Sequence, residues 1–355
     1  SDRYFGQLIQ TTTAYETSSG TIAQQEFTYL QVEPGQGVYM WNDYNGNGIQ
    51  ELQEFEIAPY SDLAIYVRVF LPNQVFVRTH QNKFSQALNF NFNQWQNEKG
   101  FKKFASHFYN QTSFLIDRKI KRNGDNFDLN PFSKEEEELI GLNTNFRNSL
   151  FFNRGKQYHS TTYSFLLNES QNLLSVGSVA AKNQSHQVQY QHLVKKSWLF
   201  NFSGSTTSTE STSENYPNRN FEIDGYQIEP KIGYLFSKNA SWDIFYEFQQ
   251  KENQIGAFET LKQTRLGTSF TFNSEKGFSM NGEFSMYNNS YDGNALSAVG
   301  FQMLEGLQPG KNQTWRLLLQ KNLTQYLDIN INYQGRNSET SKTIHTGNVQ
   351  LRAFF

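Results

Sequence analysis

Apolar and polar side chains alternate along most of the chain after Phe84, in runs of about ten residues. Successive side chains of a β-strand point to opposite faces, so each run predicts a strand with one apolar face and one polar face. Short polar turns separate the runs, and the region contains about fourteen candidate strands. The apolar positions of the clearest runs are Leu88, Phe90 and Phe92; Trp198, Phe200 and Phe202; Ile228, Pro230, Ile232, Tyr234 and Phe236; Trp242, Ile244, Tyr246 and Phe248; Leu266, Phe270 and Phe272; Phe278, Met280, Phe284 and Met286; and Trp315, Leu317 and Leu319.

The last two runs give this pattern its clearest register. The final one has apolar residues at alternate positions, Val349, Leu351, Ala353 and Phe355, with Gln350 and Arg352 between them. A last strand that ends on an aromatic residue is typical of bacterial outer-membrane barrels, where it seals against the first strand. The preceding run predicts a lipid-facing set, Leu327, Ile329, Ile331 and Tyr333, and a lumen-facing set, Asp328, Asn330 and Asn332.

The composition fits strands that have lipid on one face and water on the other. Aromatic residues make up 16% of the 355 residues, whereas only 37% are hydrophobic, and the mean hydropathy is -0.68. No apolar stretch reaches the roughly 18 residues of a membrane-spanning helix, and closed barrels are the other structure that satisfies its backbone in lipid. The sequence therefore predicts an all-β fold, a transmembrane antiparallel β-barrel of about 14 strands (12–16). The alternative is a soluble adhesin or carbohydrate-binding sandwich, but soluble strands usually have about five or six residues.

Residues 1–80 have a different pattern, with a turn-rich centre and several acidic residues. They predict a small β-rich soluble or periplasmic module, followed by the barrel over residues 81–355. Within the module, residues 65–71 predict a strand that is closed by Pro72 and Asn73.

Further expectations concern single elements of the barrel. Phe104, Phe108, Phe114 and Ile116 are expected on one face of a long strand. Short turns are expected at residues 237–240, 273–277 and 336–340, and a long polar loop over residues 206–219. Residues 173–180 fit either an extra strand or a loop.

The most specific local motif lies in the module, at residues 43–54 (DYNGNGIQELQE). It matches the calcium-loop pattern D-x-[DN]-x-[DN]-G-x5-E at every specified position. A hard cation takes six to eight oxygen ligands, and alternate residues of a tight loop can point their oxygens inward together. We expect one structural Ca2+, held by the side chains of Asp43, Asn45, Asn47, Glu51 and Glu54 and by the backbone carbonyl of Ile49.

This loop resembles the calcium loop of EF-hands, over these twelve residues alone. Its flanks differ from that family, because residues 38–41 and 55–57 predict strands instead of two helices. The alternative is a plain Asn-Gly turn between strands. That turn would explain residues 45–48, but it leaves Asp43 and Glu54 without a reason.

Other candidate chemistry in the sequence is weak. Residues 133–140 predict a capped short helix with four glutamates, which we expect to be a solvated helix in a loop. The six histidines are scattered, and no nucleophile elbow or phosphate loop is present. We therefore expect no enzyme activity. Net charge is -2, which does not favour nucleic-acid binding, and the absence of cysteine excludes disulfides.

The style of the whole chain resembles large outer-membrane proteins of Bacteroidota, which are Gram-negative. The residues that carry this resemblance are 41–51 (WNDYNGNGIQE), 66–70 (YVRVF), 305–310 (EGLQPG) and the terminal strand. The resemblance implies a barrel that follows periplasmic β modules in a longer polypeptide and works within multi-protein surface complexes. We expect Ser1 to be the edge of a fragment, because residues 3–9 already have the pattern of the interior of a strand.

Two functions are compatible with such a barrel in the outer membrane. The first is a non-enzymatic subunit of an outer-membrane complex for secretion, assembly or nutrient capture, with the lipid bilayer and other outer-membrane or periplasmic proteins as partners. The second is a porin-like channel for small solutes. A selective pore needs charges clustered at a constriction, whereas charged residues are only 18% of this chain and concentrate in loops and the first 80 residues. This favours the first.

Overall fold

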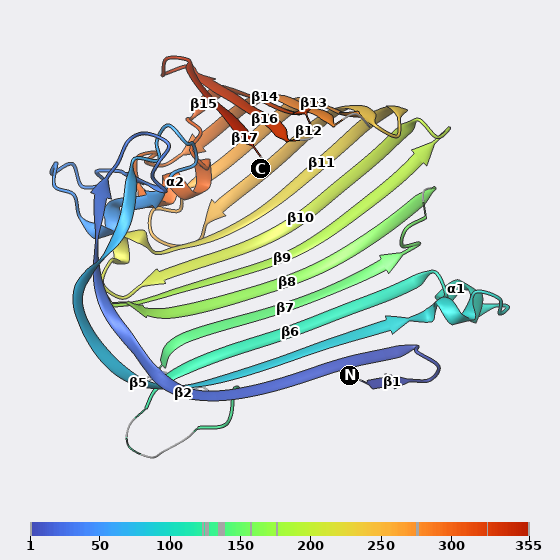
Figure 1. The fold of residues 1–355 in the computed structure, drawn as a ribbon, viewed down its shortest axis with the longest axis horizontal. Helices are drawn as coiled ribbons and strands as arrows, with labels where there is room; N and C mark the ends of the chain where they lie inside the picture. The colour runs from blue at the N-terminus through green and yellow to red at the C-terminus, as the bar shows by residue number, and fades with distance from the viewer. Residues whose placement is uncertain are drawn as a thin grey trace.

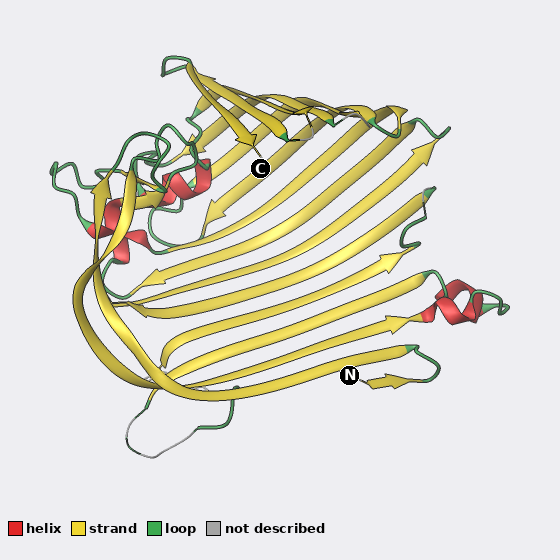
Figure 2. Cartoon of the chain, viewed as in Figure 1, coloured by secondary structure: helices red, strands yellow, loops and turns green. Residues whose placement is uncertain are grey.

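One antiparallel sheet dominates the computed structural model, which describes residues 2–122, 124, 128–133, 139–156, 158–174, 177–274, 277–324 and 326–353. In this part of the chain the sheet has 17 strands, and the α-helices are α1 (Phe101–Ala105) and α2 (Ala298–Leu304) (Figure 2). No helix of the described residues is long and apolar enough to cross a membrane. The expected all-β class is therefore confirmed.

Fourteen strands of the described part have ten or more residues. They are β2 (Ile9–Gln31), β5 (Tyr66–Asn91), β6 (Phe108–Lys121), β7 (Leu139–Phe152), β8 (His159–Leu174), β9 (Gly177–Val194), β10 (Trp198–Ser213), β11 (Phe221–Ser237), β12 (Ala240–Asn253), β13 (Thr260–Ser274), β14 (Phe278–Asp292), β15 (Gly310–Thr324), β16 (Leu327–Ser338) and β17 (Ile344–Ala353). The short strands are β1 (Asp2–Tyr4), β3 (Tyr39–Trp41) and β4 (Phe55–Ile57).

The strands follow one another in chain order across the sheet. β2 pairs with β5, and from β5 each strand pairs with the next one up to β17. β1 covers one end of β2, and the hairpin of β3 and β4 joins β5 at Tyr39. No ladder in the described residues joins β17 to β1 or β2, so the sheet curves strongly but is not closed (Figure 1).

The two faces of the sheet differ as the alternation predicts. Leu317 pairs with Gly282 and Tyr333 on one face, whereas the adjacent Leu318 pairs with Asn281 and Asn332 on the other. The first face, here called the outer face, carries a belt of aromatic and aliphatic side chains that are 39–65% exposed. This outer belt comprises Trp198, Phe200, Phe202, Ile228, Ile232, Trp242, Ile244, Tyr246, Leu266, Phe272, Phe284, Met286, Val349 and Leu351.

The opposite face is concave, and we call it the inner face. Side chains of strands from β11 to β17 line one cavity there, which requires the sheet to curve around them. The expected register of β16 places its two sets on different faces. Ile329, Ile331 and Tyr333 pair with outer-face neighbours, and Asn330 and Asn332 pair with inner-face neighbours.

The two ends of the sheet differ in the length of their connections. At one end, the short-turn end, residues 195–197, 238–239, 275–277 and 325–326 join neighbouring strands, and residues 92–107 with α1 and residues 153–158 are longer exceptions. At the other, the long-loop end, the connections include residues 122–138, 214–220, 254–259 and 293–309, and the connection between β8 and β9 is the short exception. Most connections are therefore short at one end of the sheet and long at the other.

β2 and β5 extend beyond the rest of the sheet at the long-loop end. The ladder of β5 with β6 ends at Thr79 and Lys121, but the ladder of β5 with β2 continues to Tyr66 and Gln31. The resulting two-stranded ribbon curves towards α2 (Figure 1). Residues 32–65, here called the tip segment, lie at the end of this ribbon. They contact β16, the loop between β10 and β11 and the loop after α2, which we call the opposite wall.

This ribbon changes the expected organisation of the first 80 residues. β5 runs from Tyr66 through residue 80 to Asn91, and β2 belongs to the same sheet. Only the tip segment lies outside the long strands, and its β3–β4 hairpin joins the sheet at Tyr39. Pro72 does not close the strand, since β5 continues past it to Asn91. The register shifts between Phe70 and Gln74, and such a bulge accommodates proline, which has no N–H to donate to the ladder.

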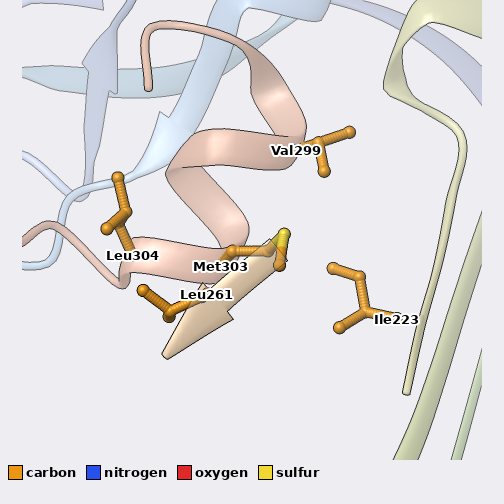
Figure 3. Close-up of a cluster of buried hydrophobic side chains, with 5 residues drawn as sticks. All are labelled: Ile223, Leu261, Val299, Met303 and Leu304. Atoms are coloured by element: carbon orange, nitrogen blue, oxygen red, sulfur yellow. The ribbon is translucent and has the colours of Figure 1, made fainter. Parts of the chain in front are cut away.

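α2 lies over the inner face at the long-loop end. Its N-cap Ser297 accepts a hydrogen bond from the N–H of Gly300 at 3.0 Å. Its apolar side packs against Ile223 of β11 and Leu261 of β13, and both Leu261 and Met303 are almost fully buried (Figure 3). The full cluster is Ile223, Leu261, Val299, Met303 and Leu304. α2 therefore narrows the mouth of the curved sheet.

Several expectations for single elements need correction. Phe104 lies in α1, outside the strand that begins at Phe108. Residues 206–213 continue β10 and are not a loop; their Ser and Thr side chains are polar on both faces, which hid the strand. Residues 173–174 end β8 and residues 177–180 begin β9. The predicted helix at residues 133–140 and the terminal Phe355 fall mostly or wholly outside the described residues.

Candidate functional site

The predicted metal loop lies in the tip segment, between β3 and β4. The 3-10 helix η1 (Leu52–Glu54) completes the connection, and Trp41 pairs with Phe55 at its base. The expectation of strands on both sides of the loop is therefore confirmed. Gly46 and Gly48 both have a φ of 72°, a left-handed conformation that glycine adopts without strain.

The carboxylate of Asp43 organises the first half of the loop. One of its oxygens accepts hydrogen bonds from the N–H groups of Gly46 at 2.8 Å and Asn47 at 3.1 Å. The other oxygen accepts one from Gly48 at 2.8 Å. These bonds satisfy the backbone of a tight loop, which would otherwise leave its N–H groups to solvent.

Asn45, Asn47 and Glu51 converge in the second half. The amide nitrogens of Asn45 and Asn47 donate to the two oxygens of Glu51, at 3.0 Å and 3.4 Å. Their carbonyl oxygens accept from the N–H groups of Asn47 and Ile49, at 3.0 Å and 2.6 Å. Three of the six predicted ligands are thus brought together by the fold.

Glu54 is 1% exposed, the most buried acidic side chain of the tip segment. Its Oε2 accepts hydrogen bonds from the indole of Trp41 at 2.7 Å and from the N–H of Glu51 at 3.4 Å. Its Oε1 is buried and has no hydrogen-bond partner among the described residues. A buried carboxylate oxygen without a partner is costly, and a cation is one group that would satisfy it.

The donor types of the loop fit a hard cation, because all are carboxylate, amide or backbone oxygens. The arrangement is not a complete ligand shell, however. No three His, Asp or Glu side chains of the described chain form a group that could hold a metal. To close on an ion, the amides of Asn45 and Asn47 would turn so that their oxygens replace the N–H groups now facing Glu51.

The tip segment rests on the inner face of β16. The carboxylate of Asp62 accepts hydrogen bonds from both terminal guanidinium nitrogens of Arg336, each at 2.6 Å. The hydroxyl of Ser61 accepts one from the side-chain amide of Gln334 at 3.0 Å. The same guanidinium lies 4.0 Å from the ring centre of Tyr60. Hydrogen bonding from Arg336 holds the pKa of Asp62 below its ordinary value of 3.8, so this carboxylate is charged at neutral pH.

A second ion pair joins the tip segment to the loop between β10 and β11. Arg219 donates to Glu56 at 2.5 Å and to the carbonyl of Gln53 at 2.7 Å. Tyr44 donates to the same carboxylate at 3.2 Å. Burial raises the pKa of Glu56, against the opposing effect of Arg219, and burial also raises the pKa of Tyr44. The loop of residues 43–54 is therefore fixed to the loop between β10 and β11 through Gln53, Tyr44 and the adjoining Glu56.

Gly306 allows the close contact between the tip segment and the loop that follows α2. Its φ is 81°, and a Cβ there would lie 2.5 Å from a ring carbon of Pro59. Any larger residue would push the two segments apart.

A cavity of about 580 Å³ lies between Tyr60 and the inner face. Its wall centres on Arg265 of β13, which contacts Glu283 at 2.5 Å, Glu247 at 3.3 Å and the hydroxyl of Ser285 at 3.1 Å. Glu247 and Ser285 are 7% and 0% exposed. These charges are thus paired with one another within the wall.

Sequence reasoning did not find this charged group. The three charged residues occupy polar positions of three successive predicted strands: Glu247, Arg265 and Glu283. The alternation predicts that they share a face, but not that they are in contact. Their contact depends on the cross-strand register, which pairs Glu247 directly with Arg265. A search for opposite charges on the polar face of consecutive strands is the signal that could have found them.

No protein-family model matches the chain, and no curated protein matches its sequence. The class that the fold defines is therefore stated from the structure alone: an all-β protein built on one large, curved antiparallel sheet, whose inner face is partly covered by a tip segment and a short helix.

Proposed function

We propose that the chain is an integral outer-membrane β-barrel that serves as a non-enzymatic subunit of an outer-membrane protein complex. The observation that carries this proposal is the outer belt, fourteen exposed apolar side chains on β10–β14 and β17. A soluble monomer rarely exposes an apolar surface that extends over so many neighbouring strands. Hydrocarbon covers such a belt without cost, and the polar inner face then lines the lumen.

Closure of the barrel would join β17 to the edge of β2 that β1 leaves free, beyond Thr11. β2 runs from the short-turn end to the long-loop end and β17 runs in the reverse direction, so the pair would be antiparallel. The barrel would then contain the fourteen long strands, an even number as in bacterial single-chain barrels. Lipid supports this closure, because an open edge leaves backbone groups without partners in hydrocarbon.

The lengths of the connections orient the proposed barrel. Outer-membrane barrels have short turns on the periplasmic side and longer loops outside. The tip segment, α2 and the ion pairs of Asp62 and Glu56 would then lie at the extracellular rim. This replaces the periplasmic position that the sequence suggested for the first 80 residues, and it presents the tip segment to other surface proteins.

A porin-like channel is the second candidate function, and the contents of the mouth argue against it. α2 packs on the inner face through Met303 and Leu304, and the tip segment is held to the wall by Arg336. Both reduce the free cross-section at the long-loop end.

We expect the isolated protein in planar bilayers to show no large, steady, ohmic conductance, because these two segments occupy its mouth. The measurement is single-channel recording at neutral pH. Large uniform steps would favour the porin function over the complex subunit.

We further propose that the tip segment binds one structural Ca2+ through Asp43, Asn45, Asn47, Glu51, Glu54 and the carbonyl of Ile49. The support is the motif itself, the convergence on Glu51 and the unpartnered oxygen of Glu54. The ion would supply charge neutralisation and rigidity to the turn.

Removal of calcium with a chelator is expected to make the tip segment more sensitive to protease and to leave the sheet intact. An ion that binds only the folded state stabilises it by about 2.7 kcal/mol when its concentration is about 100 times Kd. Glu54→Gln should abolish the response, whereas Glu33→Gln, an exposed acid outside the loop, should retain it. Cleavage rates that are equal with and without chelator in the unchanged protein would refute the calcium proposal.

A further inference from the structure

The inner face carries one continuous row of neutral hydrogen-bonding side chains, here called the polar row. Each member pairs directly with the next across neighbouring strands from β2 to β14, so all share the inner face. The row is Gln10, Asn89, Gln111, Ser149, Ser164, Gln187, Ser205, Gln227, Gln249, Gln263 and Asn289. No member is charged or apolar.

Two cavities open along this row. The first is the cavity beneath Tyr60 already described, which Gln227, Gln249 and Gln263 help to line. The second has a volume of about 510 Å³ and is lined by side chains of β8–β11, Gln187 and Gln227 among them. Gln227 lines both cavities, so they adjoin at β11, and we call the two together the trough. The trough meets the row at Gln187, Gln227, Gln249 and Gln263, and it extends to Ser160 and Thr162 of β8, away from the row.

Five side-chain amides in this trough have no hydrogen-bond partner in the part of the chain that the structure describes. The side chains of Gln227 and Gln249 make no hydrogen bond to the described residues, and the same holds for Gln189, Gln191 and Asn201 in the second cavity. Each amide offers both donors and an acceptor. They are free to bind a ligand that also donates and accepts.

Two of the arginines that line the first cavity are paired within the protein, whereas Arg316 also lines that cavity and Glu229 and Lys231, one charge of each sign, line the second. Arg265 is paired with Glu247 and Glu283, and Arg336 is paired with Asp62. A charged ligand would find no counter-charge in the row, and an apolar ligand would leave the amides unsatisfied. The group that fits is the hydroxyl, which is neutral and both donates and accepts.

We infer that the trough binds a neutral oligosaccharide along the polar row. The row from β9 to β13 covers four strand spacings, about 19 Å in all, which suits a chain of sugars better than a single one. Tyr60 and Tyr287 of the first cavity offer rings on which a sugar can stack. A polypeptide fits less well, because the row offers no apolar pocket for its side chains. This inference rests on the proposal that the inner face is a barrel lumen.

Calorimetric titration of the full chain in detergent tests the inference, with neutral hexasaccharides as probes: maltohexaose, cellohexaose and xylohexaose. We expect saturable binding of at least one of them, and much weaker binding of a hexagalacturonate and of a neutral Gly-Ser hexapeptide. The double variant Gln227→Leu, Gln249→Leu should weaken binding about ten-fold through the loss of two hydrogen bonds. Gln86→Leu, on the exposed outer face of β5, should not change it.

A second double variant, Gln191→Leu, Asn201→Leu, covers the case in which the first does not fold, and a heat-dependent shift in gel mobility shows folding for each variant. Absence of binding by all neutral hexasaccharides to protein that shows this shift would overturn the inference alone. Equal or tighter binding of the charged sugar or the peptide would also overturn it. Absence of the shift in the unchanged protein would instead overturn the proposed barrel.

Discussion

Arginine in place of Leu317 is expected to lower the free energy of unfolding in lipid by about 2–4 kcal/mol more than arginine in place of Leu318. The two residues are adjacent, chemically identical and on opposite faces of β15. Leu317 lies among outer-face residues, and Leu318 pairs with two asparagines of the inner face. In a membrane the first arginine must leave water, whereas the second stays in a polar lumen.

The measurement is reversible unfolding by guanidinium in lipid vesicles, with Leu317→Ala and Leu318→Ala as controls for the loss of packing. In a soluble protein both positions would face water. Equal losses for the two arginine variants would therefore contradict the assignment of the outer face to lipid.

Replacement of Arg265 by methionine is expected to destabilise the protein by about 3 kcal/mol, near the lower end of the range for a broken buried ion pair. Methionine keeps much of the volume but leaves Glu247 and Glu283 without their shared cation. Glu283 is one-third exposed in its side chain and recovers some hydration, which limits the loss.

The triple variant Arg265→Met, Glu247→Gln, Glu283→Gln should recover most of that stability, because no unpaired charge remains. Both variants can be measured by the same guanidinium titration. The guanidinium carbon of Arg265 lies 4.6 Å from the ring centre of Phe245. A triple variant as unstable as the single one would mean that this packing contributes more to stability than the charge pairing does.

The alternation of the sequence predicted the faces of the sheet well, because side-chain direction in a strand is a local property. Leu327 to Tyr333 illustrates this: the expected sets separate onto different faces. β2 was missed because the prediction depends on a difference in polarity between the two faces. Its Thr, Ser and Gln residues are polar on both faces, so a strand of 23 residues has no apolar period to detect.

Long-range packing lay beyond the sequence pattern. The contacts of Asp62 with Arg336 and of Glu56 with Arg219 join residues more than 160 positions apart. They depend on the curvature of the ribbon of β2 and β5, which brings the tip segment to the far wall. Local patterns contain no information about that curvature.

The loop of residues 43–54 shows what local patterns predict and what they miss. The motif and the strands around it were evident from residues 38–57, since both are local. The burial of Glu54 and its bond to Trp41 follow from packing within the β3–β4 hairpin. The motif assigned Glu54 to the ion with two oxygens, whereas the fold already uses Oε2 and leaves Oε1 free.

Gel mobility with and without heating tests the central claim most directly. A closed barrel resists SDS at room temperature and unfolds only when heated, so the purified protein in detergent should migrate at two different positions. The same preparation should require detergent to remain in solution, because the outer belt is apolar. A single position at both temperatures, together with solubility in the absence of detergent, would contradict the membrane barrel.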